Sequence, residues 1–371
     1  MGHEGGMQAL VIGGTGPTGH FMVGGLLRRG FRVAILHTGR HELEEIPPEV
    51  EHIHTDPYDP AALRSALHGR TFDVCIATYG RLRATAEILS GKVGKFVSVG
   101  GVPAYRGYMN PTIDDPAGLP VPTSEDAPRV QRVEQDAKGY RIARTEEALF
   151  IAQPAAAHFR YPYVYGPYQL VPREWCIVRR IRDDRCAIIL PDDGLTLQSF
   201  GYAENLAHAV LLAVDHPERS AGEIYNCCDE ETLTLRQVVE IIASALGHDL
   251  RIISMPHTIA IPARPLMMQP LPTHRVLDLT KLRTQLGYRD VVPAREAIAR
   301  TARWLMDHPC EPGGLEETVL EDPFDYPAED RLIEAWEKTL AALPEIHFEK
   351  QPGYGLAYSG PGGRTPSKPF E

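Results

Sequence analysis

The chain has 371 residues, of which 43% are hydrophobic and 23% charged, so it can form a sizeable folded core. Its formal net charge of -11 argues against diffuse attraction to phosphate, and nucleic acid is not an expected partner. No apolar run approaches the roughly 18 residues that cross a bilayer, and residues 1–6 lack the pattern of a signal peptide. The sequence therefore predicts a cytoplasmic globular protein that does not bind membranes.

Predicted strands and helices alternate from the start of the chain. Residues 9–12 form a short apolar run that predicts a strand, and helical spacing of apolar residues over 21–27 predicts a helix. A second strand at 31–36 completes a β-α-β unit. Further strands are predicted at 50–54, 72–77 and 95–99, with helices at 60–67 and 84–89. This alternation is typical of α/β proteins with a doubly wound parallel Rossmann sheet.

Prolines interrupt residues 105–129 and predict a long loop, after which the pattern is less regular. The later predicted elements are helices at 131–151, 203–213, 235–246 and 294–306, and strands near residues 158–160, 188 and 224. The domains expected are a dinucleotide-binding Rossmann domain at 7–165, a smaller C-terminal α/β substrate lobe at 166–310 with some segments returning to the first domain, and a C-terminal extension at 311–371 with one helix at 328–343 and a Gly/Pro-rich tail.

A glycine-rich turn lies between the first predicted strand and helix. Gly13, Gly16 and Gly19 are three residues apart. In this context they permit a tight turn, close backbone approach to a pyrophosphate, and packing of the helix on the strand. The helix N-terminus adds partial positive charge for the phosphates. The turn predicts dinucleotide binding by the residues Gly13, Thr15, Gly16, Pro17, Thr18 and Gly19.

The end of the second strand bears on the choice of cofactor. An acid here would hold the ribose hydroxyls of NAD, but the chain has His37, Thr38 and then Arg40. Arg40 and His37 can meet a 2′-phosphate, which favours NADP over NAD, although Arg40 can equally be a solvated loop cation. Asp56 and Pro57, after the third strand, are placed to border the adenine, and Asp56 is alternatively a helix cap.

Several segments together resemble the extended short-chain dehydrogenase/reductases. They include the glycine turn, Phe96-Val97-Ser98-Val99, the helix around Tyr140, the run from Arg160 to Pro167, and Glu223-Ile224-Tyr225-Asn226. The stretches 175–180, 191–194 and 199–209 look like the atypical branch with chloroplast stem-loop RNA-binding proteins and epimerase/dehydratase-like chains. Residues 276–278 and 281–288 look like the family's closing segment.

The resemblance implies a nicotinamide-binding lobe, a smaller substrate lobe and a homodimer formed through a helix pair. It also assigns to the cofactor several residues that follow the fourth and sixth strands, namely Thr78, Tyr79, Gly80, Pro162 and Val164.

In the family that the chain resembles, a tyrosine exchanges a proton with the substrate oxygen, a lysine four residues later lowers its pKa, and a serine polarises the oxygen. Tyr140 and Arg144 have this spacing, with arginine in place of lysine, and Ser98 is the candidate serine. Arginine is an imperfect substitute because it keeps its proton. Counting back from Tyr105 puts glycines at the serine positions. A one-residue slip puts Gly139 at the tyrosine position, with Lys138 as a nearby cation.

Other polar residues give weaker signals. Five tyrosines border the expected cleft and can either replace the missing phenol or simply pack, namely Tyr105, Tyr108, Tyr163, Tyr165 and Tyr168. A basic cluster over 179–185 can either bind a phosphate or carboxylate or form the solvated face of a helix. The fifteen histidines are scattered, and the six cysteines show no paired spacing, so no metal site is predicted and the thiols are expected to be reduced and buried.

These observations predict an NADP(H)-dependent oxidoreductase that reduces a carbonyl, or oxidises a secondary alcohol, of a small organic substrate. Two alternatives remain open. A sugar-nucleotide epimerase or dehydratase with retained NAD(P) would return the hydride to its substrate. A non-catalytic nucleotide-binding or RNA-associated protein would keep the lobe without the chemistry, although the acidic charge argues against RNA.

Overall fold

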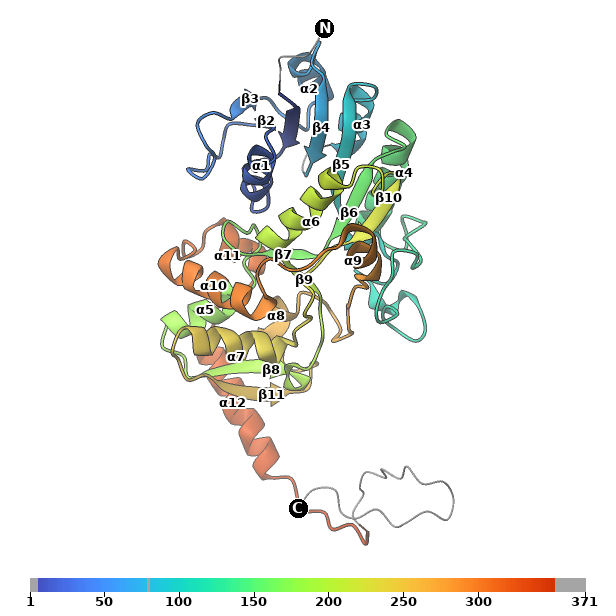
Figure 1. Cartoon of the computed structure of the whole chain (residues 1–371). Coiled ribbons are helices and arrows are strands. Elements are labelled where there is room, and N and C mark those ends of the chain that lie inside the picture. Colours follow the sequence, from blue (N-terminus) through green and yellow to red (C-terminus); the bar gives the residue numbers. More distant parts are fainter. Residues whose placement is uncertain (1–5, 79–80, 351–371) are drawn as a thin grey trace, which may run out of the picture. The chain divides into compact units, whose positions relative to one another are not determined.

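The computed structural model describes residues 6–78 and 81–350. The chain divides into two compact units, Met1–Asp325 and Tyr326–Glu371, and each is described by itself. Figure 1 follows the chain by colour from the blue N-terminal strands to the red C-terminal helix. Tyr79 and Gly80, which are predicted cofactor contacts, lie outside the described residues.

The first unit is built around a seven-stranded sheet whose neighbouring strands are all parallel. The strand order is β10-β6-β5-β4-β1-β2-β3. The winding direction reverses between β1 and β4, and open α/β sheets bind ligands beyond the carboxyl ends of the strands at such a point. The predicted doubly wound parallel sheet is confirmed. Its strands are β1 (Gln8–Ile12), β2 (Arg32–His37), β3 (Glu51–His54), β4 (Phe72–Ala77), β5 (Val93–Gly101), β6 (Ala157–Tyr161) and β10 (Glu223–Asn226).

Helices cover both faces of this sheet, as Figure 1 shows. Alternate strand residues enter different apolar clusters, so that Val11 packs on one side and Leu10 on the other. The first face is covered by α1 (Gly19–Arg28), α6 (Ala203–Asp215) and α9 (Thr280–Leu286). The second face is covered by α2 (Pro60–Ala66), α3 (Leu82–Ile88) and α4 (Ala137–Ala152).

The smaller lobe has its own apolar core, in which Trp175 is fully buried. Two pairs of parallel strands contribute to it, β7 with β9 and β8 with β11. The predicted smaller α/β lobe is confirmed. Its main elements are β7 (Tyr163–Tyr165), α5 (Trp175–Arg182), β8 (Ala187–Pro191), β9 (Phe200–Tyr202), α7 (Leu235–Ala245), β11 (Arg251–Met255), α8 (Arg264–Met267) and α10 (Ala294–Asp307). Short 3-10 helices lie at Val102–Ala104, Pro111–Ile113, Asp192–Gly194 and Ile261–Ala263.

The C-terminal region differs from the prediction of one helix after residue 310. The structure has α11 (Leu315–Leu320) in the first unit and α12 (Tyr326–Ala341) in the second. In the first unit, Leu320 packs in the core of the smaller lobe, and the indole Nε1 of Trp175 donates a hydrogen bond to Glu317 at 2.9 Å. A helix as short as α11 has too few turns for its periodicity to be recognised in a sequence. The strand β11 and the helix α9 were also not predicted.

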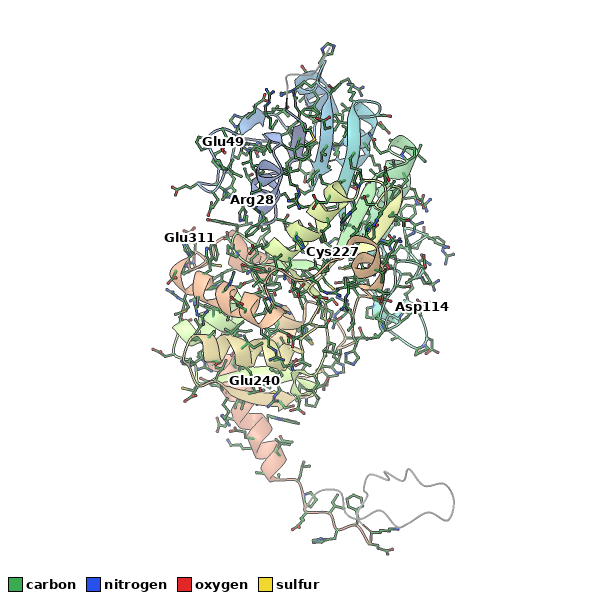
Figure 2. All side chains as sticks on the ribbon, in the orientation of Figure 1. Arg28, Glu49, Asp114, Cys227, Glu240 and Glu311 are labelled. Carbon is green, nitrogen blue, oxygen red and sulfur yellow. The ribbon has the colours of Figure 1, made fainter. Side chains whose placement is uncertain are left out.

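The six cysteines are free thiols. The expectation that they are buried holds for four of them, but Cys186 is exposed and Cys310 is only partly buried. Cys227 is fully buried and is labelled inside the ribbon in Figure 2. Burial raises the pKa of its thiol, so it has no nucleophilic role at neutral pH. Among the described residues, no helix combines the length and the apolar character that a membrane span needs.

Candidate functional site

The glycine turn lies at the carboxyl end of the central strand β1. Gly13 has a φ angle of 92°, in the region that favours glycine. A Cβ on Gly19 would lie 2.8 Å from the carbonyl oxygen of Gly13 and closer still to that of Gly14, so α1 begins directly against the turn. At Gly16 the nearest described atom to a Cβ would be 3.7 Å away. The turn thus combines close packing at its ends with an open backbone in its middle, which is the geometry of a dinucleotide turn.

The first turn of α1 suits an anion. It contains no acidic residue, and the N-cap residue Thr18 makes no side-chain capping bond. The backbone N–H groups at the start of the helix are therefore not neutralised by a carboxylate. Thr15 and Pro17 lie in the same turn and are partly buried. A pyrophosphate placed here would meet the partial positive charge of the helix.

At the end of β2 the two predicted contacts of a 2′-phosphate differ in character. His37 is 4% exposed, and burial lowers the pKa of its imidazole although Glu42 acts in the opposite direction. His37 is therefore largely neutral at pH 7. Arg40 is exposed, and no ion pair involving it is recorded in the described part of the chain. The backbone N–H of Arg40 donates to the hydroxyl of Thr38 at 3.4 Å. Arg40 is thus an exposed cation at this end of the sheet, as is Arg81, whose backbone N–H donates to the carbonyl of Pro57.

The strand ends beside β1 bring further predicted cofactor residues to the same edge. The hydroxyl of Thr78, after β4, donates to the carbonyl of Ile12 at 3.0 Å and ties the two strand ends together. Asp56, after β3, accepts the N–H of Tyr58 at 2.8 Å. The alternative that Asp56 caps α2 is wrong, because Asp59 accepts the N–H groups of the first turn. Pro57 is buried beside Asp56.

The structure brings Tyr140 and Arg144 together on α4. The Arg144 guanidinium lies 5.6 Å from the centre of the Tyr140 ring and pairs with Glu147. Arg129, from the loop before α4, contacts Glu147 from the same side at 3.7 Å. The other flank of the helix faces α3, because Arg83 donates to the carbonyl of Arg141 at 3.2 Å. Since α3 starts just after β4, this second flank is the one nearer the centre of the sheet.

The structure does not bring Ser98 to a cleft. Ser98 is fully buried, and its hydroxyl lies 2.8 Å from Nδ1 of His158. Nε2 of His158 is in turn 3.5 Å from Glu146, and all three side chains are at most 1% exposed. The order serine, histidine, glutamate resembles a hydrolytic triad, but no substrate can reach it. The observed role of Ser98 is to link β5 with β6.

Beyond Ser98, the end of β5 offers no hydroxyl group to a substrate. Gly100 packs on His158, whose Nε2 would be 2.5 Å from a Cβ at this position. A Cβ on Gly101 would meet Pro103 at 3.1 Å and Ile142 of α4 at 3.9 Å. The aliphatic Ile142 therefore lies beside Gly101, at the place where the predicted chemistry needs polar groups. Lys138, one turn before Ile142, is exposed.

A buried polar cluster forms where Tyr108, from the loop after β5, meets Gln198 and Arg275, and it was not predicted as a unit. The guanidinium of Arg275 lies 4.4 Å from the ring centre of Tyr108, and both residues are 3% exposed. Among the described residues, the Tyr108 hydroxyl, Nε2 of Gln198 and two nitrogens of Arg275 make no hydrogen bond of good geometry, although Gln198 and Arg275 both approach the Tyr108 hydroxyl. Burial raises the pKa of Tyr108 to about 12 and, against the effect of Arg275 and Arg173, also raises the pKa of Tyr163. Unpartnered buried donors indicate a polar ligand.

Tyr163 connects this cluster with the cofactor edge. It follows Pro162 directly and precedes Val164, and both of these are predicted cofactor contacts. The ring of Tyr163 stacks on the ring of Phe200, with 6.0 Å between the ring centres. The guanidinium of Arg173 lies 3.7 Å from the centre of the Phe200 ring. A narrow cavity reaches the cluster, and its lining includes Arg173, Gln198, Phe200 and Gln269. Sequence reasoning missed Arg275 and Gln198 because neither belongs to a recognisable motif.

The remaining candidate tyrosines have partners of their own. The Tyr105 hydroxyl donates to Asn226 and the Tyr165 hydroxyl to Asp229, each at 2.6 Å and each in a buried position. Tyr168 donates to Glu45. In the basic cluster over 179–185, Arg180 is buried against Asp322 at 2.7 Å. These groups stabilise the fold and are not placed to bind a substrate.

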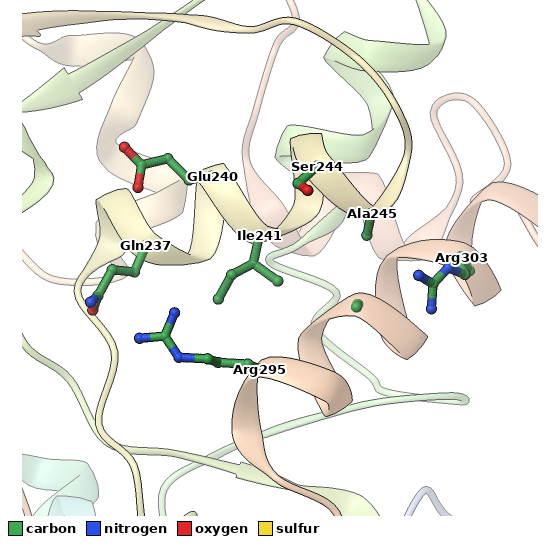
Figure 3. Close-up of a pocket in the computed structure, with 8 residues that line it drawn as sticks. Gln237, Glu240, Ile241, Ser244, Ala245, Arg295 and Arg303 are labelled. Carbon is green, nitrogen blue, oxygen red and sulfur yellow. The ribbon is translucent and has the colours of Figure 1, made fainter.

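An open hollow on the outer surface of the smaller lobe contains none of the predicted site residues. Figure 3 shows it between α7 and α10, with Glu240 and Arg295 at its sides. Arg295 pairs with Glu231 at 2.9 Å, so its charge is already compensated. We place the candidate site at the carboxyl edge of the sheet and in the cluster around Arg275.

Comparisons with known proteins agree with this fold. Residues 142–228 match the family model of the NAD dependent epimerase/dehydratase family. The chain is 28% identical over 192 residues to an uncharacterised protein, YbjS, of Escherichia coli strain K12, a match that covers 45% of this chain and 56% of that protein. The chain thus spans about half the length of this curated relative.

A second relative aligns over its whole length. It is a 3-diazoavenalumate denitrifying reductase of a Streptomyces species, 24% identical over 79% of this chain and 100% of the relative. Among solved structures, a dTDP-glucose 4,6-dehydratase from Bacillus anthracis in complex with NAD matches with a TM-score of 0.61 and 15% identity, over 82% of this chain and 97% of that one. The predicted resemblance to the extended short-chain dehydrogenase/reductases is confirmed.

Proposed function

Because the chain has the epimerase/dehydratase segment and the matching fold, we propose that it is an NADP(H)-dependent oxidoreductase acting on a carbonyl or secondary alcohol of a small organic substrate. The observation that carries this proposal is the turn at Gly13 to Gly19, which presents an open backbone and an uncompensated helix N-terminus at the switch point of the sheet. Arg40 supports the preference for NADP, because a guanidinium pairs well with phosphate.

We propose that the substrate carries an anionic or strongly hydrogen-bonding group. Arg275 and Gln198 are buried with unused donors in the described residues, and leaving such donors without a partner is costly. Burial lowers the pKa of Arg275, but an arginine remains cationic at neutral pH. A carboxylate or phosphate on the substrate would satisfy these donors, and the nearby aromatic rings would hold the apolar part.

The proposed reaction needs an acid/base group. The sequence assigns it to Tyr140, whose ring lies on the flank of α4 shared with Arg129 and Glu147. Tyr163 fits the requirement better, because its phenol follows a predicted cofactor contact and lies near the cations Arg275 and Arg173. Hydride transfer to a carbonyl needs a proton donor whose anion a neighbouring cation can stabilise. We therefore assign proton transfer to Tyr163.

The experiment that tests the proposed function is a titration of the purified protein with NADPH and with NADH. Assays then follow the oxidation of NADPH in the presence of a panel of aldehydes, ketones and keto acids. We expect tighter binding of NADPH, and turnover that is better for carbonyl compounds carrying a carboxylate. Failure of both nucleotides to bind would overturn the proposal. Binding without turnover of any carbonyl compound would point to a cofactor-binding protein without reductase activity.

A second candidate is an epimerase or dehydratase acting on a nucleotide sugar. It is favoured by the solved structures with the same fold, several of which are nucleotide-sugar enzymes. Such an enzyme would hold its NAD(P) through purification, because the cofactor is regenerated in each cycle. Mass spectrometry of the protein as isolated separates the two candidates, since a reductase exchanges its cofactor with the solvent.

A further inference from the structure

Three histidines and a glutamate meet at one end of the sheet, although no metal site is predicted from the sequence. They are His37 at the end of β2, His52 and His54 of β3, and Glu42 from the loop between these strands. One nitrogen or oxygen atom from each side chain lies within 4.8 Å of the others. The histidines predicted to be scattered are thus brought together here, because β2 and β3 are neighbours.

Strand pairing explains why these side chains converge. In the parallel register His37 is paired with His54, and Ile35 is paired with His52. Paired residues of neighbouring strands point to the same face of a sheet, and so do residues two apart on one strand. All three imidazoles therefore emerge on one face. The order β1-β2-β3 makes β3 the edge of the sheet, which leaves the site open to solvent on that side.

The loop over residues 38–50 supplies the fourth group and holds it in place. Leu43 and Ile46 are each 8% exposed and belong to the core cluster on the α1 side of the sheet. Glu42 directly precedes this anchor and turns its carboxylate toward the histidines. Figure 2 labels Glu49 near the end of the same loop. The packing of Leu43 therefore restricts the backbone beside Glu42, whose own side chain is 49% exposed.

The spacing of the ligand atoms fits a tetrahedral metal ion. Ligands about 2.0–2.1 Å from a tetrahedral zinc ion lie roughly 3.3 Å from each other. Nε2 of His37 is 3.1 Å from Nδ1 of His52. The Glu42 carboxylate lies 3.2 Å from Nδ1 of His52, 3.3 Å from Nε2 of His54 and 3.7 Å from Nε2 of His37. These four distances bracket the tetrahedral value, and the ligand atoms of all four residues lie within 4.8 Å of one another.

The donor types narrow the class of metal. Imidazole nitrogen with one carboxylate suits Zn²⁺ and its neighbours Co²⁺, Ni²⁺ and Cu²⁺, whereas Mg²⁺ and Ca²⁺ prefer oxygen ligands throughout. Nδ1 of His37 faces the N–H of Gly39 at 3.3 Å. Coordination through Nε2 puts the ring proton on Nδ1, so the contact with Gly39 must give way on binding. The hydrogen bond between Nε2 of His37 and Nδ1 of His52 must also give way, because the metal ion takes the place of its proton. Gly39, with a φ angle of 74°, lies in a turn that a small shift can accommodate.

We propose that His37, Glu42, His52 and His54 form a binding site for one divalent transition-metal ion, with Zn²⁺ as the best-fitting occupant. The site goes beyond the proposed oxidoreductase function and does not depend on it, because all four ligands come from β2, β3 and their connecting loop. It lies at the same strand end as Arg40, next to the place proposed for the 2′-phosphate. A metal ion there would fix the loop over residues 38–50.

The test is calorimetric titration of the chelator-treated, cofactor-free full-length protein with Zn²⁺. We expect one equivalent to bind with micromolar affinity or better, and the double variant His52→Ala with His54→Ala to bind at least about 100-fold more weakly, since half of the ligands are gone. His68→Ala is the matched control, because His68 is exposed on the same lobe and outside the cluster. This control should bind Zn²⁺ like the parent chain.

A second readout shows the coordination directly. Co²⁺ in the site should give the intense visible absorption of a tetrahedral complex, and the double variant should lose it. His52 and His54 have side-chain exposures of 28% and 56%, so their removal should leave the thermal unfolding of the metal-free protein unchanged. Absence of stoichiometric Zn²⁺ binding, or equal binding by the parent and the double variant, would overturn the site. Because these titrations use the cofactor-free protein, the proposed NADPH binding is tested separately by the nucleotide titrations.

Discussion

Glu146 accepts hydrogen bonds from Nε and Nη2 of Arg160, both at 2.8 Å, and the two side chains are each 1% exposed. This pair joins α4 to β6, the two elements that border the candidate site. The guanidinium also lies 4.6 Å from the ring centre of Tyr105 and donates to the carbonyl of Glu125 at 3.0 Å. The pair thus fixes the helix, the strand and the loop before α4 relative to one another.

Breaking this pair should be costly. We expect Glu146→Gln to lower the free energy of unfolding by about 3 kcal/mol, because it leaves the Arg160 charge buried without its counter-ion. Urea unfolding followed by circular dichroism measures the change. Glu147→Gln on the same helix is the control, since Glu147 is 35% exposed and its ion pairs should contribute at most about 1 kcal/mol. Similar losses in the two variants would contradict this interpretation.

A buried carboxyl group, Asp229, should make stability fall as pH rises. Burial raises the pKa of Asp229 to about 7, against the opposing effect of its hydrogen bonds from Asn205 and Tyr165. The folded state therefore holds a proton that the unfolded chain releases near pH 4. The contribution of Asp229 to the free energy of unfolding should decrease from about pH 4 to about pH 7 and then level off.

The variant Asp229→Asn isolates this effect, because its amide mimics the protonated acid. Oδ1 can still accept from the Tyr202 N–H, and the amide can donate to the Tyr165 hydroxyl. We expect the decline between pH 4 and pH 7 to flatten in this variant, as measured by thermal unfolding at a series of pH values. An unchanged pH profile would show that Asp229 is already ionised in the folded protein at low pH.

The close packing of Gly19 should make it intolerant of a side chain. Gly19→Ala would push a methyl group into the backbone of Gly13 and Gly14, so the turn must open and cofactor binding should be lost. Gly24→Ala in the same helix is the control. Its methyl would meet only the flexible end of Arg28 at 3.4 Å and should stabilise the helix by up to about 1 kcal/mol. Fluorescence titration with NADPH compares the two, and equal affinities would argue against the predicted role of the turn.

Arg40 should decide between the two nicotinamide cofactors. We expect Arg40→Ala to weaken NADPH binding by about tenfold, or about 1.4 kcal/mol, and to leave NADH binding unchanged, because only NADPH carries the 2′-phosphate. Arg64→Ala, at an exposed position of α2, is the control. Raising the salt concentration should reduce the difference in affinity between NADPH and NADH in the parent chain, but not in Arg40→Ala. Equal weakening for both cofactors would place Arg40 elsewhere on the nucleotide.

The two tyrosine candidates for proton transfer give opposite expectations. Tyr163→Phe should lower kcat by about 100-fold or more with NADPH affinity retained, because a general acid typically contributes at least that much. The kcat of Tyr140→Phe should stay within a few-fold of the parent value, since the Tyr140 ring lies on the flank of α4 with Arg144 and Glu147. The reverse result would return the role to Tyr140 as the sequence assigns it. Steady-state kinetics with the best carbonyl substrate makes the comparison.

Much of the first lobe was determined by local sequence. Apolar runs such as Leu10 to Ile12 bury both faces of a strand, and the turn from Gly13 to Gly19 carries its own backbone requirement, so each signal lies within a few neighbouring residues. The parallel sheet and the dinucleotide turn could therefore be predicted. Short elements such as α11 could not, because they are held by packing against the smaller lobe and not by their own periodicity.

Tertiary structure mainly decided which side chains face a ligand. Arg275 meets Tyr108 across more than 160 residues of chain, and His37 meets His52 and His54 only because β2 and β3 pair in a particular register. Ser98 is a plausible catalytic residue in the sequence and is fully buried in the fold. Strand register and burial depend on contacts between distant segments. A single sequence therefore determined the kind of fold and the cofactor turn, while the fold alone decided which polar groups meet and which reach solvent.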